Sequence, residues 1–106
     1  MMLITKEIAR KLPTLYANEE KSAVDIKVPL KLFNPCGAAT WFITEMDPET
    51  GLMFGWCDLG FGCPELGYVS MDEIKSVKLP FGLAIERDKF WDSDTSLQSV
   101  MDGDIR

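Results

Sequence analysis

The residues most able to do chemistry are carboxylates that lie near a lysine. Glu73-Ile74-Lys75 has a Glu-x-Lys form that, with an upstream aspartate such as Asp47 or Asp58, could hold the divalent metal of a nuclease. The same glutamate also fits a helix cap. Ser70-Met71-Asp72-Glu73 has the spacing of a capping box, in which the Ser70 hydroxyl accepts from the Glu73 amide and Glu73 turns back to Ser70. Because the cap accounts for Glu73, we expect a solvated helix start here and no metal site.

Three thiols, Cys36, Cys57 and Cys63, are the next candidates. Asp58 or Glu65 could join them around zinc, but the sequence holds no Cys-x-x-Cys pair. Histidine is absent, which removes the commonest nitrogen ligand of zinc and the usual base that activates a nucleophilic thiol. An odd number of cysteines in a chain of this size also argues against disulfides. We therefore expect free, partly buried cysteines and no cofactor.

A glycine-rich segment, Gly60-Phe61-Gly62, invites comparison with phosphate-binding loops. No Lys and Ser/Thr follow it, and Asp58 and Glu65 on either side would repel an anion. We interpret its glycines as turn residues.

Two pairs of carboxylates, Asp47 with Glu49 and Glu86 with Asp88, could serve as a general acid and base. Such pairs are common on solvated surfaces, so we predict no catalytic pair. Glu86-Arg87-Asp88 is instead predicted to hold the last strand through an ion pair with the main body of the domain.

The elements that position these residues follow from local patterns. The clearest is a hairpin over residues 40–57, because Asp47-Pro48-Glu49-Thr50-Gly51 supplies turn residues between two β-rich runs. Both of its strands are apolar on both faces, which predicts cover by helices on one side and by a loop or tail on the other. Alternation over residues 24–32 predicts a strand, and Pro29 places it at a sheet edge.

Caps and breakers predict the remaining elements. Thr5 caps a helix over 5–12 that Pro13 ends, and Ser70 caps a helix over 70–78 that Pro80 ends. A short strand at 65–69 and an edge strand at 83–87 complete a small, mostly antiparallel sheet. The fold class is thus α+β, with a single domain over 1–91 and an acidic, loosely ordered tail over 92–106 that contains a weak helix around Leu97 and Val100.

Charge and length limit the location and the partners. The 106 residues suit one domain, and they contain no signal-peptide-like start and no membrane-length apolar run, so we expect a cytoplasmic protein. Residues 1–34 carry a net charge of +2 and residues 35–106 a net charge of −8. This asymmetry favours a basic or neutral protein partner over a nucleic-acid backbone.

The aromatic residues exceed what one hairpin can bury on a single face: Trp41, Phe42, Phe54, Trp56, Phe61, Phe81, Phe90 and Trp91. Core packing accounts for most of them. Phe61 on the glycine loop and Phe90-Trp91 before the tail are left as candidate interface anchors, with Glu65 and Tyr68 beside them.

Two short motifs, Glu65-Leu66-Gly67-Tyr68 and Glu86-Arg87-Asp88, are fairly specific to one protein family. Together with residues 3–13, 40–55, 58–70 and 82–88, they give the chain, up to about Phe90, a resemblance to a bacterial family known as domain of unknown function 2958. The resemblance implies a passenger of plasmids, conjugative elements and prophages, and it carries no established activity. The tail from Trp91 onward lies outside the resemblance.

We therefore expect a non-enzymatic accessory protein of a mobile genetic element that binds another protein, one version being an acidic decoy of the anti-restriction kind. The first alternative is single-stranded nucleic-acid binding by Arg10, Lys11, Lys27 and Lys31 with exposed aromatic rings. The second alternative is the metal-dependent nuclease considered above.

Overall fold

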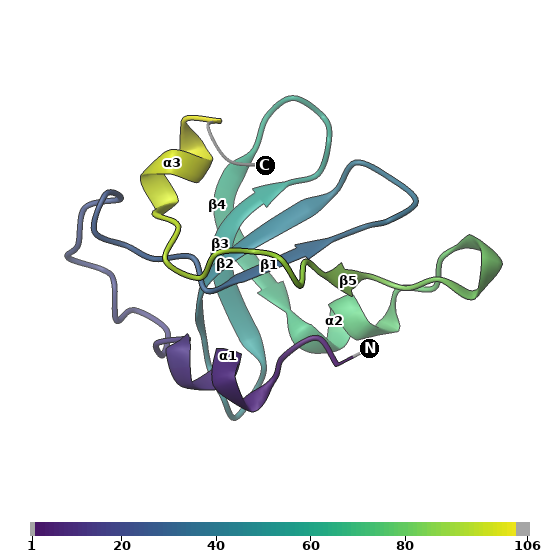
Figure 1. Cartoon of the computed structure of the whole chain (residues 1–106), viewed down its shortest axis with the longest axis horizontal. Coiled ribbons are helices and arrows are strands. Elements are labelled where there is room, and N and C mark those ends of the chain that lie inside the picture. Colours follow the sequence, from purple (N-terminus) through teal and green to yellow (C-terminus); the bar gives the residue numbers. More distant parts are fainter. Residues whose placement is uncertain (1, 104–106) are drawn as a thin grey trace.

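Five antiparallel strands form one sheet in the order β4-β3-β2-β1-β5, and three short helices lie against it (Figure 1). The computed structural model describes residues 2–103. The strands are β1 (Leu30–Phe33), β2 (Thr40–Met46), β3 (Leu52–Asp58), β4 (Glu65–Ser70) and β5 (Glu86–Arg87). The helices are α1 (Lys6–Lys11), α2 (Met71–Ser76) and α3 (Leu97–Met101), with one 3-10 turn, η1 (Pro80–Gly82). The predicted α+β class is confirmed.

The β2–β3 hairpin forms as its turn residues predict. Asp47 and Gly51 close the turn, since the Asp47 amide donates to Leu52 O and the Gly51 amide donates to Asp47 O, each at 2.8 Å. The Asp47 carboxylate accepts from the Glu49 amide at 2.9 Å, and this hydrogen bond lowers the pKa of Asp47. Gly51 has a φ of 76°, a conformation that suits glycine.

Both predicted helices begin at their expected caps. The Thr5 hydroxyl accepts from the Ile8 amide at 3.2 Å. At α2, however, the Ser70 hydroxyl accepts from the Asp72 amide at 3.1 Å, so the predicted bond to the Glu73 amide is wrong. Helix α2 also ends at Ser76, because Val77 already has an extended backbone ahead of Pro80.

The core lies on both faces of the sheet. One cluster gathers Leu30, Leu32, Ile43 and Met53 under α1 and α2, with Leu12, Met71 and Ile74 among the side chains that cover it. The other cluster joins Phe42 to Val28 and to Leu97 and Val100 of α3. This arrangement confirms the expectation that the central strands are covered by helices on one side and by the tail on the other.

The strand predicted over residues 24–32 is shorter and less exposed than expected. Only Leu30–Phe33 pairs with β2, and β5 covers its outer side at Leu32 and Phe33, so β1 is not an edge strand. Residues 26–28 pair instead with the C-terminal segment: Val28 N–H donates to Thr95 O at 2.9 Å and Leu97 N–H donates to Ile26 O at 2.8 Å. Buried Pro29 lies between the two halves, which pack into different clusters.

The segment predicted as a loosely held tail is packed as far as α3. The Ser96 hydroxyl caps the helix through the Ser99 amide at 3.2 Å, and Leu97 and Val100 are 4% and 0% exposed. The expected weak helix is therefore present, and it supplies one cover of the sheet. Met1 and the last three residues of the predicted tail, 104–106, lie outside the described residues.

Within residues 2–103, no helix has the length and apolar character needed to cross a bilayer.

Candidate protein-binding surface

A β-bulge in β2 directs an acidic side chain to an unexpected face of the sheet. Ile43 pairs with Gly55 and Glu45 pairs with Phe54, which leaves Thr44 as the extra residue. An extra residue reverses the alternation of side chains that follows it. Glu45 therefore points to the same face as Phe42 and Phe54, whereas a regular strand would direct it into the opposite cluster.

The carboxylate of Glu45 is held inside the domain, with the residue only 5% exposed. Its Oε1 accepts from the Tyr16 backbone amide at 2.6 Å, and its Oε2 lies 3.3 Å from the Thr44 hydroxyl. That hydroxyl is also 3.1 Å from Phe54 O, so two acceptors compete for its proton. Tyr16 has a φ of 70°, a left-handed conformation that is energetically unfavourable for any residue with a Cβ. In this conformation its amide donates to the Glu45 carboxylate.

A cavity of about 380 Å³ opens over this carboxylate. Glu45 and Phe54 line it on the sheet, Leu66 and Tyr68 line it on β4, and Tyr16 and Glu19 line it from the segment before β1. The Phe54 and Tyr68 rings pack with their centroids 4.9 Å apart. The cavity thus combines an apolar wall with a buried carboxylate, which is the composition typical of a recognition site.

Tyr68 and Tyr16 are linked at the mouth of the cavity. A hydrogen bond to the Tyr16 side chain raises the pKa of Tyr68, and burial and the nearby charges of Glu45 and Glu19 raise it further. Two carboxylates therefore act on the same phenol.

Strand β4 ends the sheet, and no described strand pairs with its outer side. Leu66 and Tyr68 are exposed on it, as is Tyr16 across the cavity. Natural sheets usually protect such an edge with charged side chains, especially lysine, with proline or with a bulge. Glu-Leu-Gly-Tyr-Val-Ser has one charged residue, Glu65 at its first position, and no lysine, proline or bulge. The β4 surface, meaning Leu66, Tyr68, Tyr16 and the outer edge of Glu65–Ser70, is therefore open to a partner.

The five interface candidates from the sequence divide between the two ends of the sheet. Phe61, 82% exposed, lies in the loop that leads into β4, and Glu65 and Tyr68 lie on β4 itself. Phe90, 97% exposed, follows β5 at the opposite edge. Trp91 beside it is half-buried: its indole N–H donates to Val28 O at 2.7 Å and its ring centroid is 5.6 Å from that of Phe42.

Sequence reasoning missed Glu45, Thr44 and Tyr16. The one available signal was the polar pair Thr44-Glu45 within the otherwise apolar run from Trp41 to Met46. Neither the bulge nor the contact with Tyr16, 29 residues away, could be seen in that pattern.

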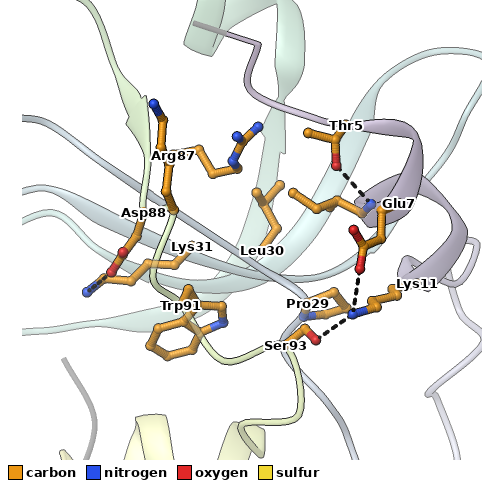
Figure 2. Close-up of a pocket in the computed structure, with 12 residues that line it drawn as sticks. Thr5, Glu7, Lys11, Pro29, Leu30, Lys31, Arg87, Asp88, Trp91 and Ser93 are labelled. Carbon is orange, nitrogen blue, oxygen red and sulfur yellow. Dashed lines mark hydrogen bonds and ion pairs between the residues drawn. The ribbon is translucent and has the colours of Figure 1, made fainter.

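A second hollow, of about 250 Å³, lies between α1 and β1 and is lined by two of the four cations proposed for nucleic-acid binding, Lys11 and Lys31 (Figure 2). Lys31 reaches Asp88 at 3.4 Å and lies 5.4 Å from the centroid of the Trp91 ring. This confirms the predicted ion pair between the Glu86-Arg87-Asp88 segment and the body of the domain. The contacts with Asp88 and Trp91 also keep the Lys31 ammonium group close to the protein surface.

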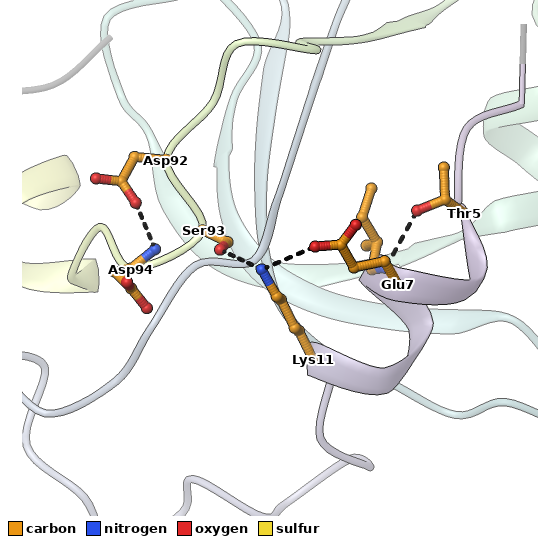
Figure 3. Close-up of polar contacts among 7 residues, drawn as sticks. Thr5, Glu7, Lys11, Asp92, Ser93 and Asp94 are labelled. Carbon is orange, nitrogen blue, oxygen red and sulfur yellow. Dashed lines mark hydrogen bonds and ion pairs between the residues drawn. The ribbon is translucent and has the colours of Figure 1, made fainter.

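The other two lysines of that proposal also have partners. Lys11 lies between the Glu7 carboxylate at 3.5 Å and the Ser93 hydroxyl at 2.9 Å (Figure 3), and the Lys27 ammonium donates to Asp94 O at 3.3 Å. Arg10 is exposed on α1. Binding a phosphate backbone would require these lysines to exchange partners, which weakens the nucleic-acid interpretation.

The residues considered for metal binding do not converge. In the described part of the chain, no group of three or more cysteine and acidic side chains is placed to hold a metal ion. Asp58 accepts from the Gly60 amide at 3.0 Å in a turn, and Glu73 is exposed on α2. Cys36 and Cys63 are exposed, so the expectation of partly buried thiols holds only for Cys57.

The thiols should react at different rates. Burial raises the pKa of Cys57, and the Glu65 carboxylate raises it further, so at pH 8 less of this thiol is the reactive thiolate. We expect Cys36 and Cys63 to react with Ellman's reagent in a fast phase and Cys57 at least about fivefold more slowly. Cys57→Ser should remove the slow phase alone, and loss of part of the fast phase would contradict the assignment.

These features define a class of protein: a small α+β domain whose antiparallel sheet is covered on both faces and left open at β4. The chain belongs to the family described as Protein of unknown function (DUF2958), whose model matches residues 3–103. The match continues through α3, so the expected end of the resemblance near Phe90 is wrong. No curated protein and no solved structure matches the chain.

Proposed function

We propose that this chain is a non-enzymatic accessory protein of a mobile genetic element, and that it acts in the host cytoplasm by binding another protein through its β4 surface. The mobile-element part of the proposal rests on what the family resemblance implies. The binding mode rests on one observation: an edge strand without lysine, proline or a bulge carries the exposed side chains of Leu66 and Tyr68, and exposed Tyr16 lies across the cavity from them.

Two physical reasons support binding at this edge. The outer backbone groups of a terminal strand are free to pair with an extended segment of another chain. Tyrosine is also enriched at interfaces, because its ring buries a large area and its hydroxyl still finds a partner. The opposite edge of the sheet offers less surface to a partner. Strand β5 has only two residues, and the Trp91 side chain beside it already donates to Val28 O.

Affinity capture from the host with variants at both edges tests the proposal. We expect the tagged wild-type chain to retain a specific protein that the double variant Leu66→Ser/Tyr68→Ser loses. Both side chains are exposed, so the double variant should remain folded.

Phe90→Ser is the control, because it removes an exposed aromatic ring at the other end of the sheet. It should retain the same protein. Capture that survives the β4 double variant and is lost with Phe90→Ser would move the interface to the β5 edge and overturn the proposal.

A further inference from the structure

The carboxylate under the β4 surface has no cation of its own. In the described part of the chain, no ion pair includes Glu45, and none includes Lys21, the one cation that lines the cavity. Buried charges in proteins are normally paired, and a carboxylate has about four acceptor positions, of which the Tyr16 amide and the Thr44 hydroxyl occupy two at most. Glu45 therefore retains acceptor capacity inside a cavity.

The walls of the same cavity suit an organic cation. The aromatic rings of Tyr16, Phe54 and Tyr68 line it, and such rings attract cations over their faces. Glu19 adds a second negative charge near the mouth, whereas the exposed Lys21 adds one positive charge. An anion would meet two carboxylates and is disfavoured, while an apolar group would leave Glu45 unpaired.

We infer that the cavity takes a long basic side chain, lysine or arginine, from the partner protein. This inference rests on the proposed function, since the side chain belongs to the protein bound at the β4 surface. Its aliphatic stem packs on Leu66 and Phe54, and its charged end reaches the free acceptor positions of Glu45. The excess of acidic residues after position 34 favours the approach of a basic partner.

The inference is tested with single-residue probes on the whole chain, followed by ¹H–¹⁵N NMR. The probes are Nα-acetyl-lysine methylamide, its arginine counterpart, and Nα-acetyl-norleucine methylamide, which has the lysine stem without the charge. We expect the two basic probes to shift the amides of Tyr16, Leu66 and Tyr68 saturably, with norleucine at least about tenfold weaker. The Tyr16 amide is a direct reporter, because it donates to Glu45.

Glu45→Gln tests the role of the carboxylate. Glutamine keeps an acceptor for the Tyr16 amide. We expect the substitution to lower the affinity for the lysine probe at least about tenfold and to leave the affinity for the norleucine probe within about twofold of wild type. Glu49→Gln, on the exposed β2–β3 turn, changes the net charge equally and should leave both probes unaffected.

The inference is overturned if norleucine binds as well as lysine, if Glu49→Gln weakens lysine as much as Glu45→Gln does, or if no probe shifts these amides. The comparison of lysine with norleucine needs no variant, so it decides even if Glu45→Gln does not fold. None of these results affects the proposed function, which fails only if capture does not depend on Leu66 and Tyr68.

Discussion

Replacing Gly55 with alanine is expected to lower the free energy of unfolding by about 3 kcal/mol or to prevent folding. A Cβ built on Gly55 would lie 2.0 Å from Phe42 O and 2.9 Å from Ile43 Cα. Both are backbone atoms of the neighbouring strand next to the Thr44 bulge, so no side-chain rotation relieves the overlap. Urea unfolding followed by tryptophan fluorescence would measure the loss.

Gly67→Ala is the matched control, because Gly67 is the residue that pairs with Gly55 across β3 and β4. A Cβ there meets no atom within 4 Å, so the change should stay within about 0.5 kcal/mol. If both variants lowered the free energy of unfolding equally, the cause would be the general effect of replacing a strand glycine, and not the close approach of Gly55 to β2.

Replacing Leu97 with alanine should destabilise the domain by about 3 kcal/mol, within the usual range for a buried leucine. Leu97 is 4% exposed and packs with Phe42 and Val28 on the face that α3 covers. A loosely held tail would give almost no effect. Thermal or urea unfolding distinguishes the two, because the predicted loss is a large fraction of the stability of a small domain.

Gln98→Ala provides the control on the same helix. Its side chain is half-buried and donates to Asp102 at 2.8 Å, a local contact worth about 0.2–0.5 kcal/mol. If Leu97→Ala were no more destabilising than Gln98→Ala, the packing of α3 against the sheet would be contradicted.

The parts of the fold that could be predicted from the sequence are those determined by near neighbours. The β2–β3 hairpin follows from Asp47 and Gly51, and α1 and α2 follow from the hydroxyls of Thr5 and Ser70. Each of these signals operates over a few residues. They also fixed the class of the fold, since a hairpin with capped helices leaves few arrangements other than α+β.

The parts that failed depend on pairing between distant segments. Alternation over residues 24–32 indicates a strand, but it cannot show that residues 26–28 bond to Thr95 and Leu97 while Leu30–Phe33 bonds to β2. The acidic segment after Asp92 is predicted to be a loose tail, because a local pattern does not show its contacts with distant residues. Two buried side chains, Leu97 and Val100, are enough to attach it to the sheet.

The candidate site was predicted only in its exposed half. Glu65 and Tyr68 are predicted interface residues and lie on β4, where Tyr68 lines the cavity. Glu45 was not selected, because the face to which it points is set by the bulge, and the bulge is a property of the register between β2 and β3.

The cover of the Phe42 face by α3 also has a consequence for biosynthesis. Roughly 40 residues separate the end of β3 from Leu97, so at cellular rates of translation the ribosome needs about 2–8 s to add them. During that interval the hairpin can form while Phe42 and Val28 still face water. The nascent chain therefore exposes an apolar sheet face to chaperones and proteases until α3 emerges. A chain truncated before Leu97 would be unable to bury that face.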